Sequence, residues 1–321
     1  MANILLTYAV PEEKMMQLKS IAGSNPIKTI LSKDITREDI LWADVILGNP
    51  PRGALHENDH LGLVALNSAG STEYCEEGVL PENTVLTNAT GAYGIIISEW
   101  LVGMLLKIMN RFDRYRDQQK AHLWKRLSEQ RFSVYGSKVL ILGTGNIGTE
   151  FAKRMKAMGA VTIGIRRVAS KPKEYFDEIC SMDDLNDLLP KVDIVVNCLP
   201  GTAATTKVIG AKQLSLMKDD AVLLNIGRGS AVDTDALVAE LEKGRFLGVG
   251  LDVTDPEPLP EDHRLWDFEN VHITPHCSGG MNSPISFNFI LEVAMDNLKA
   301  YLEGGEYRNV VDRTTGYKKT E

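Results

Sequence analysis

The chain has 321 residues, a length that corresponds to about two domains at roughly 150 residues each. A hydrophobic content of 44% and a charged content of 24% are those of an ordinary globular protein with material for a large core. A formal net charge of −8 argues against a broad nucleic-acid or anionic-membrane surface, so neither kind of partner is expected.

The cysteines and the apolar segments indicate a cytoplasmic location. The four cysteines are far apart and form no CxxC pair, which is unsuited to a disulfide framework or a zinc site. The histidines show no recognisable ligand spacing, so no metal is expected. The first residues have no basic segment or cleavage site of a signal peptide. The longest apolar stretch, Ile95 to Met109, carries two charges and is too short to span a bilayer.

The first part of the chain alternates short apolar runs with helical patterns, which is typical of a parallel sheet covered by helices. Strands are expected at Ile4–Leu6, Asp44–Leu47 and Leu63–Leu66, and helices at Pro11–Ala22 and Arg37–Ile40. A long buried helix at Ile95–Gln119 is expected to join this module to a second one.

From Lys138 the alternation begins again with more regular units. Strands are expected at Val139–Leu142, Val161–Ile165, Asp193–Leu199, Ala221–Ile226, Leu247–Leu251 and Val271–Thr274. Helices are expected between them at Ile147–Met158, Asp183–Leu189, Ala211–Met217 and Thr234–Lys243. The final helix, Pro284–Leu302, has no strand of its own, so we expect it to pack on the first module. This makes residues 1–98 and 285–321 one discontinuous domain and residues 99–284 the other.

A glycine-rich motif follows the first strand of the second module and opens the next helix. It comprises Gly143, Thr144, Gly145, Asn146, Ile147 and Gly148. In a dinucleotide site the first glycine permits the tight turn, the second lets the pyrophosphate approach, and the third lets helix and strand pack closely. The spacing strand–glycines–helix–strand predicts a dinucleotide-binding domain.

The residues after the next strand favour NADP(H) over NAD(H). An NAD site usually has an acidic residue there, which accepts a hydrogen bond from the ribose 2′-hydroxyl. This chain has Arg166 and Arg167 in that place and no acid before Glu174. A guanidinium can pair with a 2′-phosphate, so NADP(H) is expected as the preferred cofactor, with NAD(H) left open as a second one. The alternative is that both arginines are solvated loop charges.

Polar residues follow three later strands of the second module. They are Arg228 after NIG, Glu257 in DVTDPEP, and His276 in TPHCSGG. In a doubly wound sheet, the ends of neighbouring strands meet at one edge, so these side chains can converge. Each residue alone also fits a structural role: a surface ion pair, a solvated acid and a structural histidine.

The motifs together resemble the D-isomer-specific 2-hydroxyacid dehydrogenase family, in its NADP-type, glyoxylate/hydroxypyruvate reductase-like branch. The resemblance covers nearly the whole chain and is carried by NATGAYG, GTGNIG, the Leu-Pro pair, NIGRG, LDVTDPEPLP, HRLWDFENV, TPHCSGG and the terminal NVVD. It implies an α/β fold of two doubly wound parallel-sheet domains. In such a fold, a Rossmann-type cofactor domain is inserted in a discontinuous, flavodoxin-like substrate domain.

The resemblance implies a role for each of the three polar residues. Arg228 would hold the substrate carboxylate and polarise the 2-keto oxygen. His276 would be the general acid in reduction and the base in oxidation, and Glu257 would orient the imidazole and favour its charged form. The chemistry supports these roles, because hydride arriving at a ketone carbon leaves negative charge on oxygen, and a cation and a proton donor stabilise it.

The resemblance also implies residues around the cofactor and the substrate. For the substrate carboxylate it implies the backbone N–H groups of Gly70 and Ser71, with Asn49, Pro50 and Tyr74 as candidates for the wall of the side-chain pocket. Along the cofactor it implies Leu199, Pro200, Thr205, Ile226, Gly227, Asp252 and Ser278.

The expected activity is therefore hydride transfer between NADP(H) and C2 of a small 2-keto or 2-hydroxy acid of the D-series. Ser278-Gly279-Gly280 lacks the aromatic residue of the D-lactate dehydrogenase branch, which favours reduction of glyoxylate, hydroxypyruvate or a broad set of 2-keto acids. One alternative is an NAD(P)-binding regulator with little turnover, and another is a related enzyme acting on formate. By resemblance, a homodimer through the cofactor domain is expected, with Gln118–Phe132 suited to a partner surface.

Overall fold

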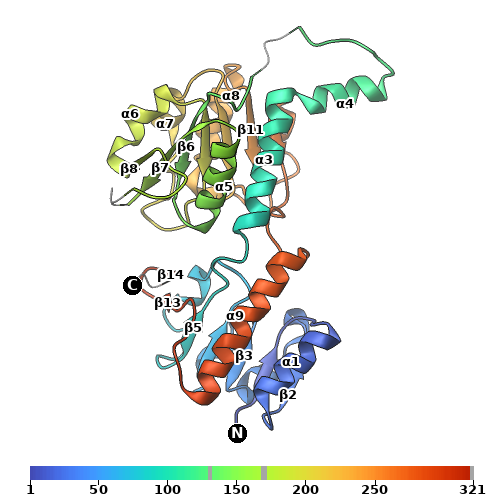
Figure 1. Cartoon of the computed structure of the whole chain (residues 1–321), viewed down its shortest axis with the longest axis vertical. Helices are drawn as coiled ribbons and strands as arrows, with labels where there is room; N and C mark the ends of the chain where they lie inside the picture. Colours follow the sequence, from blue (N-terminus) through green and yellow to red (C-terminus); the bar gives the residue numbers. More distant parts are fainter. Residues whose placement is uncertain (129–131, 168–171, 319–321) are drawn as a thin grey trace. The chain divides into compact units, whose positions relative to one another are not determined.

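A computed structural model describes residues 1–128, 132–167 and 172–318 of the chain. The chain divides into two compact units (Figure 1): unit 1 comprises Met1–Ala92 with Met281–Glu321, and unit 2 comprises Tyr93–Gly280. Each unit is a parallel sheet with helices, so the predicted α/β fold class is confirmed. The predicted domain boundary at 98/99 falls inside a helix, whereas the chain passes between the units at 92/93 and 280/281. No helix in the described ranges is long and apolar enough to cross a membrane.

Unit 2 contains a seven-stranded sheet in the order β12-β11-β10-β9-β6-β7-β8, in which every pair of neighbours is parallel. From β6 the chain adds β7 and β8 on one side of the sheet. It then returns to the other side of β6, where it adds β9, β10, β11 and β12, so that β6 and β9 are neighbours. The strands are β6 Lys138–Leu142, β7 Val161–Arg166, β8 Glu178–Ser181, β9 Ile194–Asn197, β10 Val222–Asn225, β11 Gly248–Leu251 and β12 Val271–Ile273.

Both faces of this sheet are buried, which is why its strands read as continuous apolar runs. Alternate residues of β6 enter different cores: Leu140 and Leu142 belong to one apolar cluster, and Val139 and Ile141 to the other. Helices α3 and α5 cover one face, and α6, α7 and α8 contribute to the core on the other. Their bounds are α3 Gly94–Asn110, α5 Asn146–Ala157, α6 Leu185–Leu188, α7 Ala211–Leu216 and α8 Thr234–Glu242.

The single long helix predicted at Ile95–Gln119 is wrong. The structure has two helices there, α3 and α4 (Phe112–Lys120), separated by Arg111 in the left-handed conformation at φ 53°. The Arg111 N–H donates to the carbonyl groups of Ile108 and Lys107, which closes the last turn of α3. The periodic apolar face stops at this point, and α4 has no buried residue and extends away from the sheet of unit 2 (Figure 1).

Unit 1 has a five-stranded parallel sheet in the order β2-β1-β3-β4-β5. The last helix of the chain returns to this unit, where it packs against α1 and β4. On the other face, Leu5, Ile46, Val64 and Leu86 form an apolar core with Ile40 of α2. The strands are β1 Ile4–Leu6, β2 Ile27–Thr29, β3 Val45–Leu47, β4 Leu63–Ala65 and β5 Val85–Thr87. The helices are α1 Glu12–Ala22, α2 Arg37–Trp42 and α9 Pro284–Glu303. The final hairpin pairs β13 Val311–Asp312 with β14 Tyr317–Lys318.

Three strands of the two parallel sheets were missed in the sequence, β2, β5 and β8, as were β13 and β14 of the final hairpin. The first two have three residues each, and β2 lies at the sheet edge with only partly buried or exposed residues. β8 is also an edge strand, with a single fully buried residue. Edge strands carry a weak apolar pattern, because much of their surface faces solvent.

Candidate active site

The glycine-rich loop joins β6 to α5 in a conformation that requires its glycines. Gly143 has φ 99°, and a Cβ atom there would lie 3.0 Å from the Cys198 carbonyl oxygen. A Cβ atom on Gly148 would lie 2.0 Å from the Gly143 carbonyl oxygen, so helix and loop approach too closely for any other residue. At Gly145 the space within 4 Å is open. Two glycines thus shape the turn and the third leaves room for a ligand, which is the arrangement that a dinucleotide pyrophosphate needs.

This loop lies at the topological switch point of unit 2. β6 and β9 are neighbours in the sheet, and their onward connections lead to opposite sides of it. Ligands of open α/β sheets bind outside the carboxyl ends of strands at such a point. Asn146 is the first residue of α5, so the amino end of this helix faces the same place.

The other predicted cofactor residues lie at the carboxyl ends of neighbouring strands. Arg166 is the last residue of β7, and both it and Arg167 are exposed. After β9, the Thr205 hydroxyl donates to the Pro200 carbonyl oxygen at 2.6 Å and fixes the turn that begins at Leu199. After β10, Gly227 fits closely against this turn, because a Cβ atom there would lie 2.3 Å from the Leu199 carbonyl oxygen. Ile226 beside it is 7% exposed.

Arg228 is positioned by a buried asparagine at the end of β10. The Asn225 Nδ2 donates to the Arg228 carbonyl oxygen at 3.1 Å, and its Oδ1 accepts from the Gly227 N–H at 3.2 Å. Asn197 of β9 donates to the same Oδ1 at 2.9 Å. The Arg228 side chain is exposed, and its Nη1 donates to the Gly227 carbonyl oxygen at 2.8 Å. The sequence marked Arg228, but the asparagine pair that supports its turn was missed.

Glu257 and His276 are brought together by the loops after β11 and β12. The His276 Nδ1 lies 2.6 Å from the Glu257 Oε1, and the two side chains are 50% and 42% exposed. A carboxylate only accepts hydrogen bonds, so Nδ1 carries the hydrogen and Nε2 is left for another partner. The loop of Arg228 contacts the loop of Glu257, because a Cβ atom on Gly229 would lie 1.8 Å from the Thr254 carbonyl oxygen.

The loop that carries His276 is held by the buried carboxylate of Asp252, which is 2% exposed. The Asp252 Oδ1 accepts from the Thr274 hydroxyl at 2.6 Å and from the Cys277 N–H at 2.9 Å. Its Oδ2 accepts from the Ser278 N–H at 3.0 Å, and its carbonyl oxygen accepts from the His276 N–H at 2.8 Å. His276 itself has φ 50°, in the left-handed region that is uncommon for residues other than glycine. Asp252 and Ser278 were predicted to line the cofactor, and this supporting role was missed.

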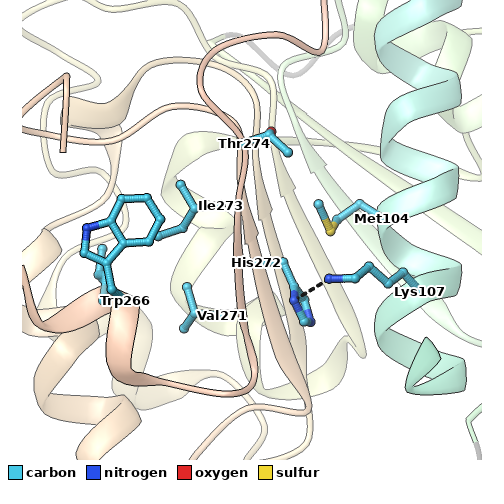
Figure 2. A pocket seen from close by; sticks show the side chains of 8 residues that line it. Met104, Lys107, Trp266, Val271, His272, Ile273 and Thr274 are labelled. Carbon is cyan, nitrogen blue, oxygen red and sulfur yellow. Dashed lines mark hydrogen bonds between the residues drawn. The ribbon is translucent and has the colours of Figure 1, made fainter. Parts of the chain in front are cut away.

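A second histidine of unit 2, His272, is paired with a lysine (Figure 2). The Lys107 Nζ of α3 is 2.6 Å from the Nδ1 of His272, in the middle of β12, beside a pocket of about 380 Å³. Burial lowers the pKa of His272, and the Lys107 charge lowers it further. Burial also lowers the pKa of Lys107. His272 is the middle residue of β12, whereas His276 lies in the loop after this strand.

In unit 1, the loop after β4 presents unused backbone donors. Neither the Gly70 nor the Ser71 N–H donates a hydrogen bond within the part of the chain that the structure describes. The loop is fixed around them: the Ser68 hydroxyl donates to the Gly70 carbonyl oxygen at 2.7 Å, and the Asn88 Nδ2 donates to the Ala69 carbonyl oxygen at 2.8 Å. Two free N–H groups on a held loop can bind an anion.

Asn49, Pro50 and Tyr74, the residues proposed for the wall of the side-chain pocket, make hydrogen bonds within unit 1. The Tyr74 hydroxyl donates to the Pro50 carbonyl oxygen at 2.8 Å, and burial raises the pKa of Tyr74 to about 12. The Asn49 Oδ1 accepts from the Asn67 N–H at 3.1 Å, which links the loops after β3 and β4. These contacts shape the loops and leave the Tyr74 side chain 8% exposed.

The fold and the strand-end residues define a dinucleotide-binding oxidoreductase of the doubly wound α/β class. Residues 102–278 match the family model for the D-isomer specific 2-hydroxyacid dehydrogenase NAD binding domain. The chain belongs to this family, whose members are enzymes that use a nicotinamide cofactor.

Several relatives cover almost the whole chain. The glyoxylate/hydroxypyruvate reductase A of Photorhabdus laumondii is 31% identical over 87% of this chain and 87% of its own length. A D-isomer specific 2-hydroxyacid dehydrogenase family protein from Aeromonas salmonicida has a structure with TM-score 0.85, 28% identity, and coverage of 97% and 99% of the two chains. The NADPH-dependent glyoxylate/hydroxypyruvate reductase of Sinorhizobium meliloti, solved with NADP and sulfate, shares the fold at TM-score 0.82 with 22% identity over 99% and 100% of the two chains.

Proposed function

We propose that the chain is an NADP(H)-preferring reductase of small 2-keto acids that yields D-2-hydroxy acids, with His276 as general acid and base. The observation that carries this proposal is the hydrogen bond of 2.6 Å between His276 and Glu257, beside the loop of Arg228. The family relatives support the reaction class, because the Photorhabdus relative is named as a glyoxylate/hydroxypyruvate reductase.

Each side chain has a distinct task in the proposed reaction. When bound, the nicotinamide donates hydride to C2 or accepts it. Arg228 pairs with the substrate carboxylate and stabilises negative charge on the 2-oxygen. The protonated His276 donates its Nε2 proton to that oxygen in reduction, and the neutral ring accepts the proton in oxidation. Glu257 accepts from Nδ1–H in both states, which fixes the orientation of the ring.

The choice of NADP(H) follows from the residues after β7 and not from the fold. The family model is described as NAD-binding, whereas the Sinorhizobium structure of the same fold was solved with NADP. In this chain the strand ends in the exposed Arg166 and Arg167, where an acid would be needed to accept from a ribose 2′-hydroxyl. Two guanidinium groups suit a phosphate instead.

We also propose that Gly70 and Ser71 of unit 1 bind the substrate carboxylate. Their N–H groups have no acceptor among the described residues, and small side chains let an anion approach the backbone. The lack of an aromatic residue in Ser278-Gly279-Gly280 and the name of the Photorhabdus relative support a short 2-keto acid such as glyoxylate or hydroxypyruvate as the substrate.

The experiment is a panel of glyoxylate, hydroxypyruvate, pyruvate, phenylpyruvate and branched 2-keto acids with NADPH and with NADH. The expected result is turnover of short keto acids with a higher kcat/KM for NADPH. His276→Ala should lose on the order of 10²- to 10⁴-fold in kcat and still bind cofactor. No turnover with any keto acid would instead support the regulatory alternative, which the enzyme relatives do not favour. Higher kcat/KM with NADH would refute the cofactor assignment.

A homodimer through the cofactor domain remains our proposal for the assembly, in the cytoplasm. Its support is the arm formed by α4 and the residues after it, where Leu123 is 59% exposed and Trp124 is fully exposed. Part of the segment predicted as a partner surface, residues 129–131, lies outside the described residues. Light scattering that gives the mass of one chain would refute the dimer.

A further inference from the structure

Lys173 is tied to the glycine-rich loop although it lies 29 residues after it in the sequence. It belongs to the segment between β7 and β8, and its Nζ donates a hydrogen bond to the Thr144 carbonyl oxygen. The Thr149 hydroxyl of α5 donates to the same oxygen at 3.2 Å. The Lys173 ammonium is therefore held at the turn between β6 and α5.

Burial and a neighbouring cation both act against the charge of Lys173. Burial lowers the pKa of Lys173, and the neighbouring Arg166 guanidinium lowers it further. Its hydrogen-bond acceptor is a neutral carbonyl group. The acid next to it in the sequence, Glu174, is hydrogen-bonded to the Tyr175 hydroxyl. Two like charges held near each other, one of them half-buried, favour an anion between them.

The two cations lie where the ribose of a dinucleotide must be bound. Thr144 follows β6, Arg166 ends β7, and β6 and β7 are neighbours with Leu142 opposite Ile165. In this fold the group at the end of the second strand contacts the ribose 2′-position. We propose that Lys173, together with Arg166, binds the 2′-phosphate of NADP(H) and is a specificity-determining residue. This inference rests on the proposed NADP(H) preference.

The physical consequence is a discrimination between two cofactors that differ in one group. The 2′-phosphate is a dianion near neutral pH and accepts charge-assisted hydrogen bonds from both side chains. The 2′-hydroxyl of NAD(H) offers no charge, so it leaves the repulsion between Lys173 and Arg166 in place. A purely structural anchor for the glycine-rich loop would instead affect both cofactors equally.

The test measures equilibrium binding without keto acid, so it does not depend on turnover. NADPH and NADH are titrated by their fluorescence, and 2′,5′-ADP is titrated by calorimetry, against the wild type and three variants. Lys173→Met removes the charge and the donor, whereas Lys173→Gln removes the charge and keeps a donor for the Thr144 carbonyl oxygen. Lys191→Met, at an exposed lysine of the same unit in the segment Leu189–Lys191, is the matched control.

Loss of one hydrogen bond to a charged group predicts that NADPH and 2′,5′-ADP bind about 10- to 100-fold more weakly to both Lys173 variants. NADH binding should change by less than about twofold. Lys191→Met should match the wild type, and the melting temperature of each variant without cofactor reports whether it is folded. Should Lys173→Met fail to fold, Lys173→Gln carries the test.

Two results would overturn the inference while leaving the proposed cofactor preference intact. One is a wild type that prefers NADPH together with Lys173 variants that keep this preference. The other is an equal loss of NADPH and NADH binding, which would make Lys173 a structural anchor. A wild type that binds NADH more tightly than NADPH would instead overturn the proposed preference itself.

Discussion

Replacing Asp252 with asparagine should loosen the loop that carries His276. The carboxylate is 2% exposed and accepts three hydrogen bonds from this loop, from the Thr274 hydroxyl and the N–H groups of Cys277 and Ser278. The best orientation of an amide keeps its oxygen on Thr274 and Cys277 and sets its NH₂ against the Ser278 N–H. One hydrogen bond is then lost and a buried donor is left unpaired, at a cost of about 1–3 kcal/mol.

The assay for Asp252→Asn combines stability with steady-state kinetics. At about 2–4 °C per kcal/mol for a domain of this size, the melting temperature should fall by several degrees. Because the loop positions His276, kcat with a keto acid should fall by on the order of 10²-fold, as expected when a catalytic group is displaced by about 1 Å. The KM for NADPH should change little, because all three of these bonds run to the loop and none depends on cofactor.

Asp267→Asn is the control for this experiment, since its side chain is 67% exposed and pairs with Arg264 at the surface. It should change the free energy of unfolding by less than about 0.5 kcal/mol. An Asp252→Asn protein with wild-type melting temperature and kcat would refute the supporting role. A raised KM for NADPH with unchanged kcat would instead show that Asp252 acts on the cofactor, as predicted from the sequence.

Two further predictions follow from the same unit. Gly148→Ala should weaken NADPH binding by more than about tenfold and lower the melting temperature. The reason is that the new Cβ atom would lie 2.0 Å from the Gly143 carbonyl oxygen and must displace the loop. Tight NADPH binding by this variant in a fluorescence titration would contradict the close packing. Glu240 is buried, and although burial alone would raise its pKa, hydrogen bonds from Lys243 and Arg245 outweigh burial and lower it. Since a lowered pKa in the folded state stabilises above the unfolded pKa, Glu240→Gln should cost roughly 1–3 kcal/mol at pH 7. The difference from wild type in urea unfolding should shrink as the pH falls below the ordinary value of 4.5, and a difference that is constant with pH would contradict it.

The sequence by itself determined six of the seven strands of the unit 2 sheet, the helices α5 to α8, and the residue types at the strand ends. Strands buried on both faces give uninterrupted apolar runs, and GTGNIG has a spacing that few other structures require. Arg228, Glu257 and His276 could be singled out because each follows such a run in a recognisable motif. The local sequence pattern is sufficient to predict a residue where a single strand or turn requires that residue type.

Only the tertiary structure decided which side chains support these residues. Asp252 was visible as a strand-end acid, but its three bonds to the loop after β12 depend on how two neighbouring strands end. Lys173 meets Thr144 across 29 residues, and nothing in the spacing between them indicates the contact. The break at Arg111 was also not predicted from the sequence. The residues after it still form a helix, but that helix buries no residue, so no packing keeps it in line with α3. These features depend on contacts between segments distant in the chain, which local propensity and periodicity do not encode.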